Sequence, residues 1–302
     1  MFKSKNGMSR ALVRRETTAG YLFLLPSLFF FVTFVLYPMF LCIYTSFFDS
    51  NMGKNAVDVF VGLGNYKELF QDKLFLGALK NTVLIVVVAV PTVCAFSLWV
   101  ATAIYDMKPA LTSAFRCIFY LPVVTGSVAV TVVWKWMYNN RYGVFNYFFK
   151  SLGIIDQNIN WLGDARFALW CIILILFTTS VGQPIVLYVS ALGNVDHSLV
   201  EAAEVDGANR RQVFWKIKWA QIMPTTLYIL IITTINSFQC FALIQLLTSG
   251  GPTHSTDTIM YYIYYTAFKL YRYGYGNAMG VVLMVIIAVL SAVQFKLGQR
   301  SD

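Results

Sequence analysis

The stretch EAAEVDGANRRQVFWKI, from Glu201 to Ile217, is a charged segment between two long apolar runs. Its 17 residues carry three acids and three bases, whereas the apolar run on each side carries none. What such a segment does depends on whether the flanking runs lie in a membrane or in a water-soluble core. The composition of the whole chain separates these two cases.

The chain has too few polar residues for a soluble protein. Of its 302 residues, 12% are charged and 58% are hydrophobic, and the mean hydropathy is +0.63. A soluble domain carries about 25% charged residues, because polar side chains must cover its surface. The composition therefore predicts an integral membrane protein.

Two other classes are disfavoured. The net charge of +9 is compatible with nucleic-acid binding, but the bases do not cluster on one helix or alternate with stacking aromatics in a polar context. The five cysteines all lie within or at the edge of apolar runs, without CxxC or metal spacing. We therefore expect no nucleic-acid partner, no disulfide and no metal site.

Six segments are long and apolar enough to cross a bilayer, which needs about 20 residues. They are residues 20–47, 82–104, 115–138, 167–191, 225–247 and 276–295. The predicted fold class is thus all-α, a polytopic membrane protein with six transmembrane helices. Residues 20–295 form the membrane domain, 192–223 a loop within it, 1–19 a basic tail and 296–302 a second tail.

The distribution of basic residues sets the orientation. The two tails, the 105–116 turn and the 192–223 loop hold 13 of the 23 Lys and Arg residues, against 10 on the other side. Because basic loops stay inside, both termini and the opening stretch are expected in the cytoplasm. The expected location is a bacterial-type cell membrane, in contact with lipid.

The sequence lacks the groups that usually drive ion-coupled transport, bind ATP or carry out catalysis. No acid or base lies in the interior of a predicted span, although ion-coupled transporters generally place such groups there. There is no GxxxxGK[ST] phosphate loop, and His197 and His254 have no partner at catalytic spacing. We therefore expect no enzyme, no bound cofactor, and energy that comes from another subunit.

The opening stretch predicts two short helices. Ser198 followed by Glu201 has the spacing of a capping box, so a first helix is expected to begin near Leu199. Gly207 is suited to a left-handed stop, and Asn209 with Gln212 repeats the cap pattern for a second helix.

The first helix has small residues on its surface. Ala202 and Ala203 would let another protein approach closely, with Glu201 and Asp206 making polar contacts at the rim. The alternative is a loop helix that merely lies on the lipid headgroups, although such helices usually carry more basic and larger apolar residues. Both interpretations remain open on physical grounds.

A family resemblance adds to this pattern. Glu201-Ala202-Ala203, then Asp206-Gly207-Ala208, then Ile217 and Pro224, resemble the EAA loop of permease subunits of binding-protein-dependent ABC importers. Further motifs are similar to the carbohydrate branch, of the maltose, multiple-sugar and glycerol-phosphate type, and to its first permease subunit in the six-span form. They are YLFLLP (Tyr21 to Pro26), FVGLGNY (Phe60 to Tyr66), FYLP (Phe119 to Pro122), LTSGGP (Leu247 to Pro252) and YGYGNA (Tyr273 to Ala278).

The resemblance implies a type I ABC importer permease fold and an ATP-driven sugar importer. In that family the EAA loop is a coupling helix, here Glu201, Ala202, Ala203, Asp206, Gly207 and Ala208, that docks on the ATPase. The implied partners are a second, non-identical permease, a dimeric cytoplasmic ATPase that holds ATP and Mg²⁺, and an external or periplasmic solute-binding protein.

Polar residues in the fourth and fifth spans are candidates for a sugar path. Thr233, Asn236 and Gln239 follow one another at i, i+3 and i+6, so a continuous helix would carry them on one face. Phe241 could stack on a sugar ring, and Gln183 lies beside Pro184 in the fourth span. The alternative for the buried polar groups is hydrogen bonding to a neighbouring helix.

Two other functions remain as alternatives. A self-sufficient channel or facilitator for a small polar solute would conduct without ATP or partners. A membrane enzyme would need a cluster of polar catalytic groups, which the sequence does not identify. The identity of the sugar cannot be read from these residues.

Overall fold

The computed structural model describes residues 10–50 and 58–299, and there it confirms the expected all-α architecture. Residues 1–9 and 300–302, from the two predicted tails, lie outside the described part. The helices are α1 (Arg10–Phe31), α2 (Tyr37–Thr45), α3 (Gly64–Gln71), α4 (Lys73–Ile104), α5 (Pro109–Val124), α6 (Ser127–Met137), α7 (Val144–Ser151), α8 (Ala168–Ser180), α9 (Gly182–Gly193), α10 (His197–Val205), α11 (Arg210–Val213), α12 (Trp219–Phe238), α13 (Ala242–Leu247), α14 (Ile259–Tyr264) and α15 (Tyr273–Gln299). Three π-helical turns adjoin them: η1 (Val32–Leu36), η2 (Phe214–Lys218) and η3 (Tyr265–Lys269). Two antiparallel strands of two residues each, β1 (Phe48–Asp49) and β2 (Val59–Phe60), complete the described elements.

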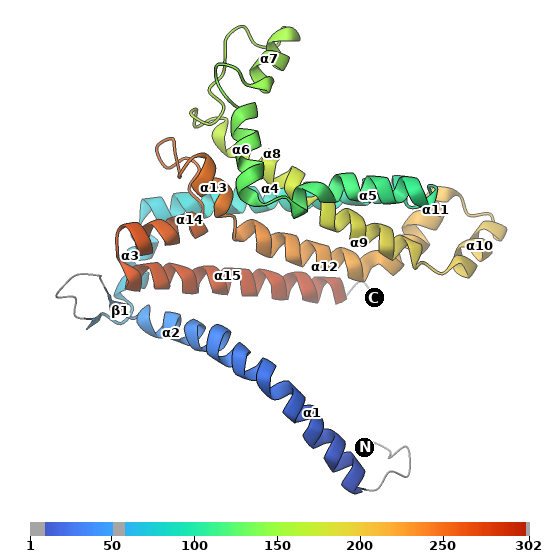
Figure 1. Cartoon of the computed structure of the whole chain (residues 1–302), viewed down its shortest axis with the longest axis horizontal. Helices are drawn as coiled ribbons and strands as arrows, with labels where there is room; N and C mark the ends of the chain where they lie inside the picture. Colours follow the sequence, from blue (N-terminus) through green and yellow to red (C-terminus); the bar gives the residue numbers. More distant parts are fainter. Residues whose placement is uncertain (1–9, 51–57, 300–302) are drawn as a thin grey trace.

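The long helices other than α1 form one bundle (Figure 1). Helix α4 packs against α8, α9 and α12, while α5 packs on α9 and α15 on α12. Val93, Ile185 and Ile229, one from each of α4, α9 and α12, are almost fully buried where these helices meet. We call the end of the bundle that carries α10 the inner end, and the opposite end, near β1, the outer end.

Most of the predicted spans correspond to helices of the bundle. Five helical segments are long and apolar enough to cross a membrane, and a sixth crossing results if α5 and α6 count together. The segments are Thr17–Thr45, Lys73–Ile104, Ala168–Gly193, Arg210–Leu247 and Tyr273–Gly298. The second and fifth begin earlier than predicted, because their helices extend past the apolar stretch at one end.

The third predicted span, residues 115–138, is wrong as a single helix. Helices α5 and α6 meet at an angle of 95°. Thr125 at the end of α5 has extended backbone angles, as does Gly126 before α6. Pro122, which cannot donate a backbone hydrogen bond, lies in the last turn of α5 and weakens the helix where it ends. Helix α6 therefore turns away from the bundle and carries α7 with it (Figure 1).

The outer end of the bundle is held by a half-buried carboxylate. Asp72 caps α4 by accepting hydrogen bonds from the backbone N–H groups of Leu74 (2.8 Å) and Phe75 (3.3 Å). It also accepts from the hydroxyl groups of Tyr262 (2.7 Å) and Tyr275 (2.9 Å). Partial burial raises the pKa of Asp72, but these four hydrogen bonds outweigh it and leave that pKa below its usual value. The starts of α4, α14 and α15 are thereby joined.

Helix α1 leaves the bundle. It is joined at the outer end, where Asn277 of α15 donates a hydrogen bond to the hydroxyl group of Thr45 in α2 (2.6 Å). From there α1 runs away from the other long helices (Figure 1). None of the 18 most apolar consecutive residues of the segment Thr17–Thr45 is buried.

Candidate functional site

The coupling segment predicted from the opening stretch is built around α10. The helix begins one residue after Asp196, whose carboxylate accepts a hydrogen bond from the backbone N–H of Ser198 (2.9 Å). The predicted Ser198–Glu201 capping box is therefore wrong, because the stronger acceptor two residues earlier takes the N-cap position. Hydrogen bonds from Ser198 hold the pKa of Asp196 below its usual value.

The end of α10 follows the prediction. Gly207 has a φ of +84°, and its N–H donates to the carbonyl oxygen of Glu204 (3.1 Å). The N–H of Ala208 donates to the carbonyl oxygen of Ala203 (2.9 Å). This pair of hydrogen bonds is a Schellman motif, which needs a residue in the left-handed region at the position of Gly207.

The second predicted helix is also confirmed, but it is much longer than expected. Asn209 and Gln212 form a reciprocal capping box over 2.8 and 2.9 Å. From Arg210 the helical path runs through α11, η2 and α12 to Phe238 without a break. The loop predicted at 192–223 is therefore too long, because the continuous helix of the fifth span already begins at Arg210.

Two contacts tie the coupling segment to the bundle. The backbone N–H of Asp196 donates to the side-chain carbonyl oxygen of Gln221 in α12 (3.1 Å). The Lys218 ammonium group donates to the hydroxyl group of Tyr105, which follows α4, and lies 4.6 Å from its ring centroid. A displacement of α10 would thus reach α12 directly.

Helix α10 itself is uncovered. None of its residues is buried, and Val205 is 89% exposed. Of the six residues predicted to couple to an ATPase, Glu201, Ala202, Asp206 and Gly207 are exposed, while Ala203 and Ala208 are half-buried. The helix stands at the inner end of the molecule, away from the long helices (Figure 1). Its coupling role stays a prediction.

A cavity of about 170 Å³ lies between α5, α8–α9 and α12. Each wall uses one face of a helix, at positions i, i+1, i+4, i+5 and i+8. The first wall is formed by Thr179, Ser180, Gln183, Pro184 and Leu187, and the second by Tyr228, Ile229, Ile232, Thr233 and Asn236. Val123 of α5 closes one side. Polar side chains from two spans thus meet in otherwise apolar surroundings.

The cavity brings together three of the five residues predicted to line a sugar path. Gln183, Thr233 and Asn236 line it. Gln239 does not, because α12 ends at Phe238 and Gln239 is its C-cap, so the i, i+3, i+6 pattern is broken after Asn236. Phe241 also lies outside the cavity. Its ring packs against that of Tyr264 in a separate aromatic cluster, with 4.9 Å between the ring centroids.

Sequence reasoning missed several wall residues. Tyr228 is 50% exposed and lies eight residues before Asn236, so the helical period could have placed it on the same face. Thr179 and Ser180 precede Gln183 by one turn. Gly182 gave no signal, yet a Cβ atom there would lie 2.3 Å from the carbonyl oxygen of Phe119, so only glycine lets α5 approach α9 beside the cavity.

The structure also places a base deeper than the sequence suggested. Arg116 was assigned to the edge of the third span, but it is the eighth residue of α5. It lines a second hollow, of about 460 Å³, together with Gln183 and Leu187 of the cavity wall. Arg116 is the second residue of the predicted third span but lies in the middle of α5, because that helix begins before the predicted span.

Metal ligation has no support in the described residues: no group of three or more His, Cys, Asp or Glu side chains there could hold an ion.

Comparisons with known proteins fit this arrangement. Residues 75–302 match the family model described as binding-protein-dependent transport system inner membrane component. The chain therefore belongs to this permease family. The permease is 32% identical over 288 residues to the lactose transport system permease protein LacF of Rhizobium radiobacter, covering 94% of this chain and 95% of LacF. It is 31% identical over 283 residues to the multiple sugar-binding transport system permease protein MsmF of Streptococcus mutans, covering 94% and 96%.

The fold has a solved counterpart. A chain of a bacterial alginate ABC transporter, in complex with an alginate pentasaccharide-bound periplasmic protein, superposes with a TM-score of 0.81. The two chains are 24% identical, and the match covers 95% of the permease and 96% of that chain. The permease thus has the type I ABC importer fold and lies in the inner membrane as a multi-pass protein.

Proposed function

We propose that the permease forms one half of the translocation pathway of an ATP-driven sugar importer, with the cavity between α5, α9 and α12 as its share of the sugar path. The observation that carries the proposal is the meeting of Gln183, Thr233 and Asn236 in that cavity. Amide and hydroxyl groups in apolar surroundings need hydrogen-bond partners, and a sugar offers many. The names of LacF and MsmF support a carbohydrate as cargo.

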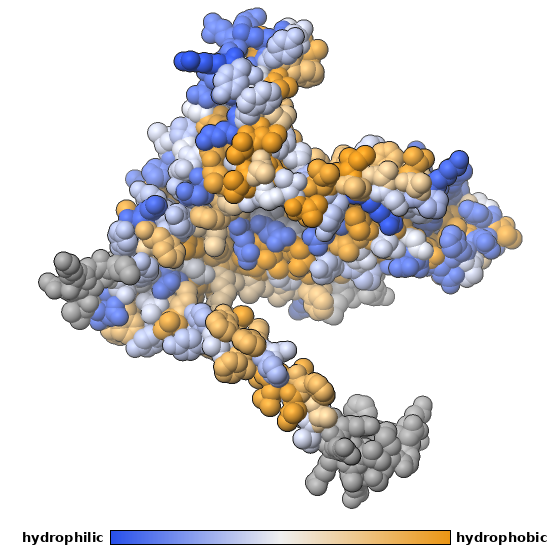
Figure 2. Space-filling model, in the orientation of Figure 1, coloured by the Kyte–Doolittle hydropathy of each residue, from blue (hydrophilic) through white to orange (hydrophobic). Residues whose placement is uncertain are grey.

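A second, non-identical permease would complete the path. Gln183 and Asn236 line the cavity and are nevertheless exposed, so this chain does not close the cavity by itself. The splayed helix α1 supports the same partner, since Phe23 (85% exposed) and its neighbours form an apolar surface (Figure 2). Exposed apolar surface of this extent is covered by lipid or by protein.

Energy would enter through α10. We place Glu201, Ala202, Ala203, Asp206, Gly207 and Ala208 in contact with one subunit of a dimeric cytoplasmic ATPase, which holds ATP and Mg²⁺, so that this chain needs no cofactor of its own. The exposure of α10 and the unbroken helix from Arg210 to Phe238 support this role. Movement of α10 would shift Asn236 and Thr233, at the far end of that helix.

The cycle is alternating access. A solute-binding protein delivers sugar at the outer end, and ATP binding closes the ATPase dimer. The closure moves α10 and opens the cavity outward, and hydrolysis returns it to the inward-facing state. The periplasmic protein bound to the alginate transporter supports the first partner.

The test is uptake into proteoliposomes that contain this permease, a second permease, the ATPase and the binding protein. ATP-dependent accumulation of a neutral or acidic di- or trisaccharide is expected. Sugar flux through the purified permease alone, without ATP, would instead support the facilitator. Glu201→Lys is expected to abolish uptake while ATP hydrolysis by the complex continues, and normal uptake by this variant would refute the coupling role.

A further inference from the structure

A second polar site lies near the outer end of the permease, apart from the cavity. A groove of about 580 Å³ separates the segment that follows α6 from the loop between α13 and α14. One side is lined by Lys135, Asn139, Asn140, Arg141, Tyr142 and Asn160, and the other by Leu247, Thr248, Gly251 and Pro252. We call this space the outer groove.

The first side of the outer groove is held by a buried amide. Asn146 of α7 is 2% exposed, and its Nδ2 donates to the carbonyl oxygens of Asn140 (3.2 Å) and Ile159 (3.0 Å). Its Oδ1 accepts from the backbone N–H of Ile159 and from the indole N–H of Trp161, both at 3.0 Å. These four hydrogen bonds of one side chain join the segment before α7 to the segment after it.

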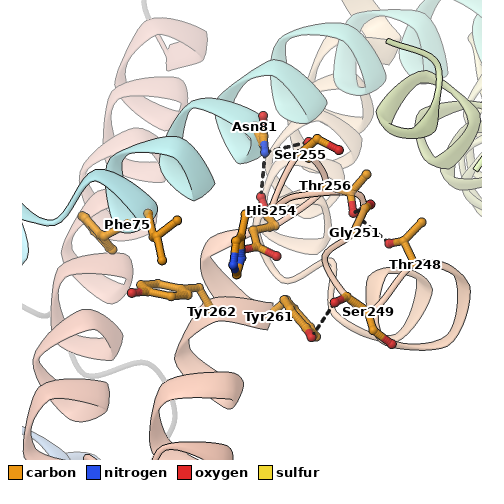
Figure 3. A network of polar contacts seen from close by, with 12 residues as sticks. Phe75, Asn81, Thr248, Ser249, Gly251, His254, Ser255, Thr256, Tyr261 and Tyr262 are labelled. Carbon is orange, nitrogen blue, oxygen red and sulfur yellow. Dashed lines mark hydrogen bonds and ion pairs between the residues drawn. The ribbon is translucent and has the colours of Figure 1, made fainter. Parts of the chain in front are cut away.

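The second side is held by the polar network of Figure 3. The hydroxyl group of Thr256 donates to the carbonyl oxygen of Gly251 and lies 2.8 Å from that of Thr248. Tyr261 donates to the carbonyl oxygen of Ser249 (2.8 Å). Asn81 of α4 donates to the carbonyl oxygens of Ser255 (3.1 Å) and Asp257 (3.0 Å), which anchors the loop to the bundle. Both walls are therefore formed before any ligand arrives, which lowers the cost of binding.

The lining has the chemistry of a carbohydrate site with a positive charge. Asn140 is exposed, and the backbone carbonyl rather than the side chain of Asn140 takes part in the bonds of the wall. Tyr142 is 63% exposed and offers an aromatic face with a polar tip. Lys135 and Arg141 have no ion-pair partner in the described part of the chain, and no acid is among the described residues that line the groove. A cleft lined by charge of one sign attracts ligands of the other, and a guanidinium group matches a carboxylate in bidentate geometry.

A third, intermediate hollow lies beside the cavity, on the side of helix α13. This hollow, of about 250 Å³, shares Val123 and Thr179 with the cavity. Its far wall includes Leu243 of α13, one helical turn before Leu247 of the outer groove. Helix α13 thus contributes one residue to the intermediate hollow and another to the outer groove.

We propose that the outer groove is a binding site for an acidic sugar unit, one that carries a carboxylate, in an oligosaccharide on its way to the cavity. This inference rests on the proposed sugar path and adds a class of cargo to it. Arg141 and Lys135 hold the carboxylate, and Tyr142 contacts the ring face with its own ring, while Asn140 lines the groove beside them.

The test uses the full-length permease in nanodiscs, without ATPase or binding protein, so that it does not depend on transport. Asn140→Cys is introduced together with Cys117→Ser, which removes the exposed native thiol, and labelling by a membrane-impermeant maleimide is timed. Trigalacturonate is expected to slow the labelling about threefold when its concentration is about twice its Kd. Maltotriose, a neutral trisaccharide, is expected to have no such effect.

Two controls accompany the measurement. Tyr147→Cys, on α7 outside the groove and 78% exposed in the parent chain, is expected to label at one rate with or without either sugar. Adding Arg141→Gln to Asn140→Cys is expected to remove the protection, whereas Arg166→Gln, which lies outside the groove beside Asp164, is expected to keep it. Labelling of Asn140→Cys that is unchanged up to saturating trigalacturonate, or protected equally by maltotriose, would overturn the proposal. Failure of ATP-driven uptake would instead count against the proposed function.

Discussion

The backbone N–H of Asp196 donates a hydrogen bond to the side-chain carbonyl oxygen of Gln221 over 3.1 Å. Asp196 is the N-cap of the exposed helix α10, and Gln221 lies near the start of α12, whose other end lines the cavity. The bond therefore joins α10 directly to the helix that lines the cavity.

Loss of this bond should weaken coupling. Gln221→Leu keeps the approximate volume but removes the acceptor, at a cost of about 1 kcal/mol for a single hydrogen bond. We expect fewer sugar molecules transported per ATP hydrolysed in the reconstituted importer, with normal insertion. Gln221→Glu keeps an acceptor oxygen and should restore the ratio. An unchanged ratio in the Leu variant would show that Lys218 and the helix itself suffice.

Substitution at Gly207 should disturb the end of α10. A β-branched side chain in the left-handed region costs about 1–2 kcal/mol, so Gly207→Val is expected to distort the turn before Asn209. Uptake should fall strongly while the amount of permease in the membrane stays the same. Gly207→Asn, which tolerates this backbone conformation, should retain most of the uptake. Equal loss in both variants would point to a contact of the glycine itself with the ATPase.

The cavity gives a matched pair of variants. Asn236→Leu removes a hydrogen-bonding group from the wall, and Gln239→Leu removes one just outside it. Loss of one hydrogen bond to the sugar should raise the KM for uptake about tenfold for Asn236→Leu, and Gln239→Leu should leave it near the wild-type value. A larger effect at Gln239 than at Asn236 would contradict the assignment of the cavity.

The stability of the permease should depend on pH through Asp72, at the outer end of the bundle. The pKa of Asp72 is depressed in the folded permease, so its carboxylate stabilises the fold above the unfolded-state pKa of about 3.9. This stabilisation is lost as the pH falls through the lower, folded-state pKa. The thermal unfolding midpoint of the wild type should therefore drop more steeply below about pH 4 than that of Asp72→Asn.

Tyr275→Phe supplies the control for this dependence. It removes one of the four donors to Asp72 and should give a slope between those of the wild type and Asp72→Asn. Parallel slopes for the wild type and Asp72→Asn would assign the acid sensitivity to other carboxylates.

Local patterns predicted local features well. The stop at Gly207 and the cap formed by Asn209 and Gln212 depend on residues within one turn of each other, so the sequence contains all of the relevant interactions. The start of α10 was misplaced for the same local reason, because two acceptors, Asp196 and Ser198, competed for one position. Both outcomes concern choices made within a few residues.

The site required the tertiary structure. Whether Gln239 continues the face of Thr233 and Asn236 depends on where α12 ends. Just past that end, the carbonyl oxygen of Cys240 accepts a hydrogen bond from the hydroxyl group of Thr258, 18 positions along the chain. Proline alone did not locate the 95° bend after Val124, since Pro91 lies inside a continuous α4 while Pro122 precedes a break.

The sequence alone was enough to predict a multi-span membrane protein with two short helices and a glycine turn between its apolar runs, because hydropathy and cap chemistry act over short distances along the chain. Its motifs were also enough to show the resemblance to the permease family. Only the tertiary structure decided which polar groups share a cavity, that Arg116 lies within α5, and that an outer groove forms between Asn140 and Thr248. These depend on helix ends and bends, and on contacts between residues more than a hundred positions apart, which no local pattern contains.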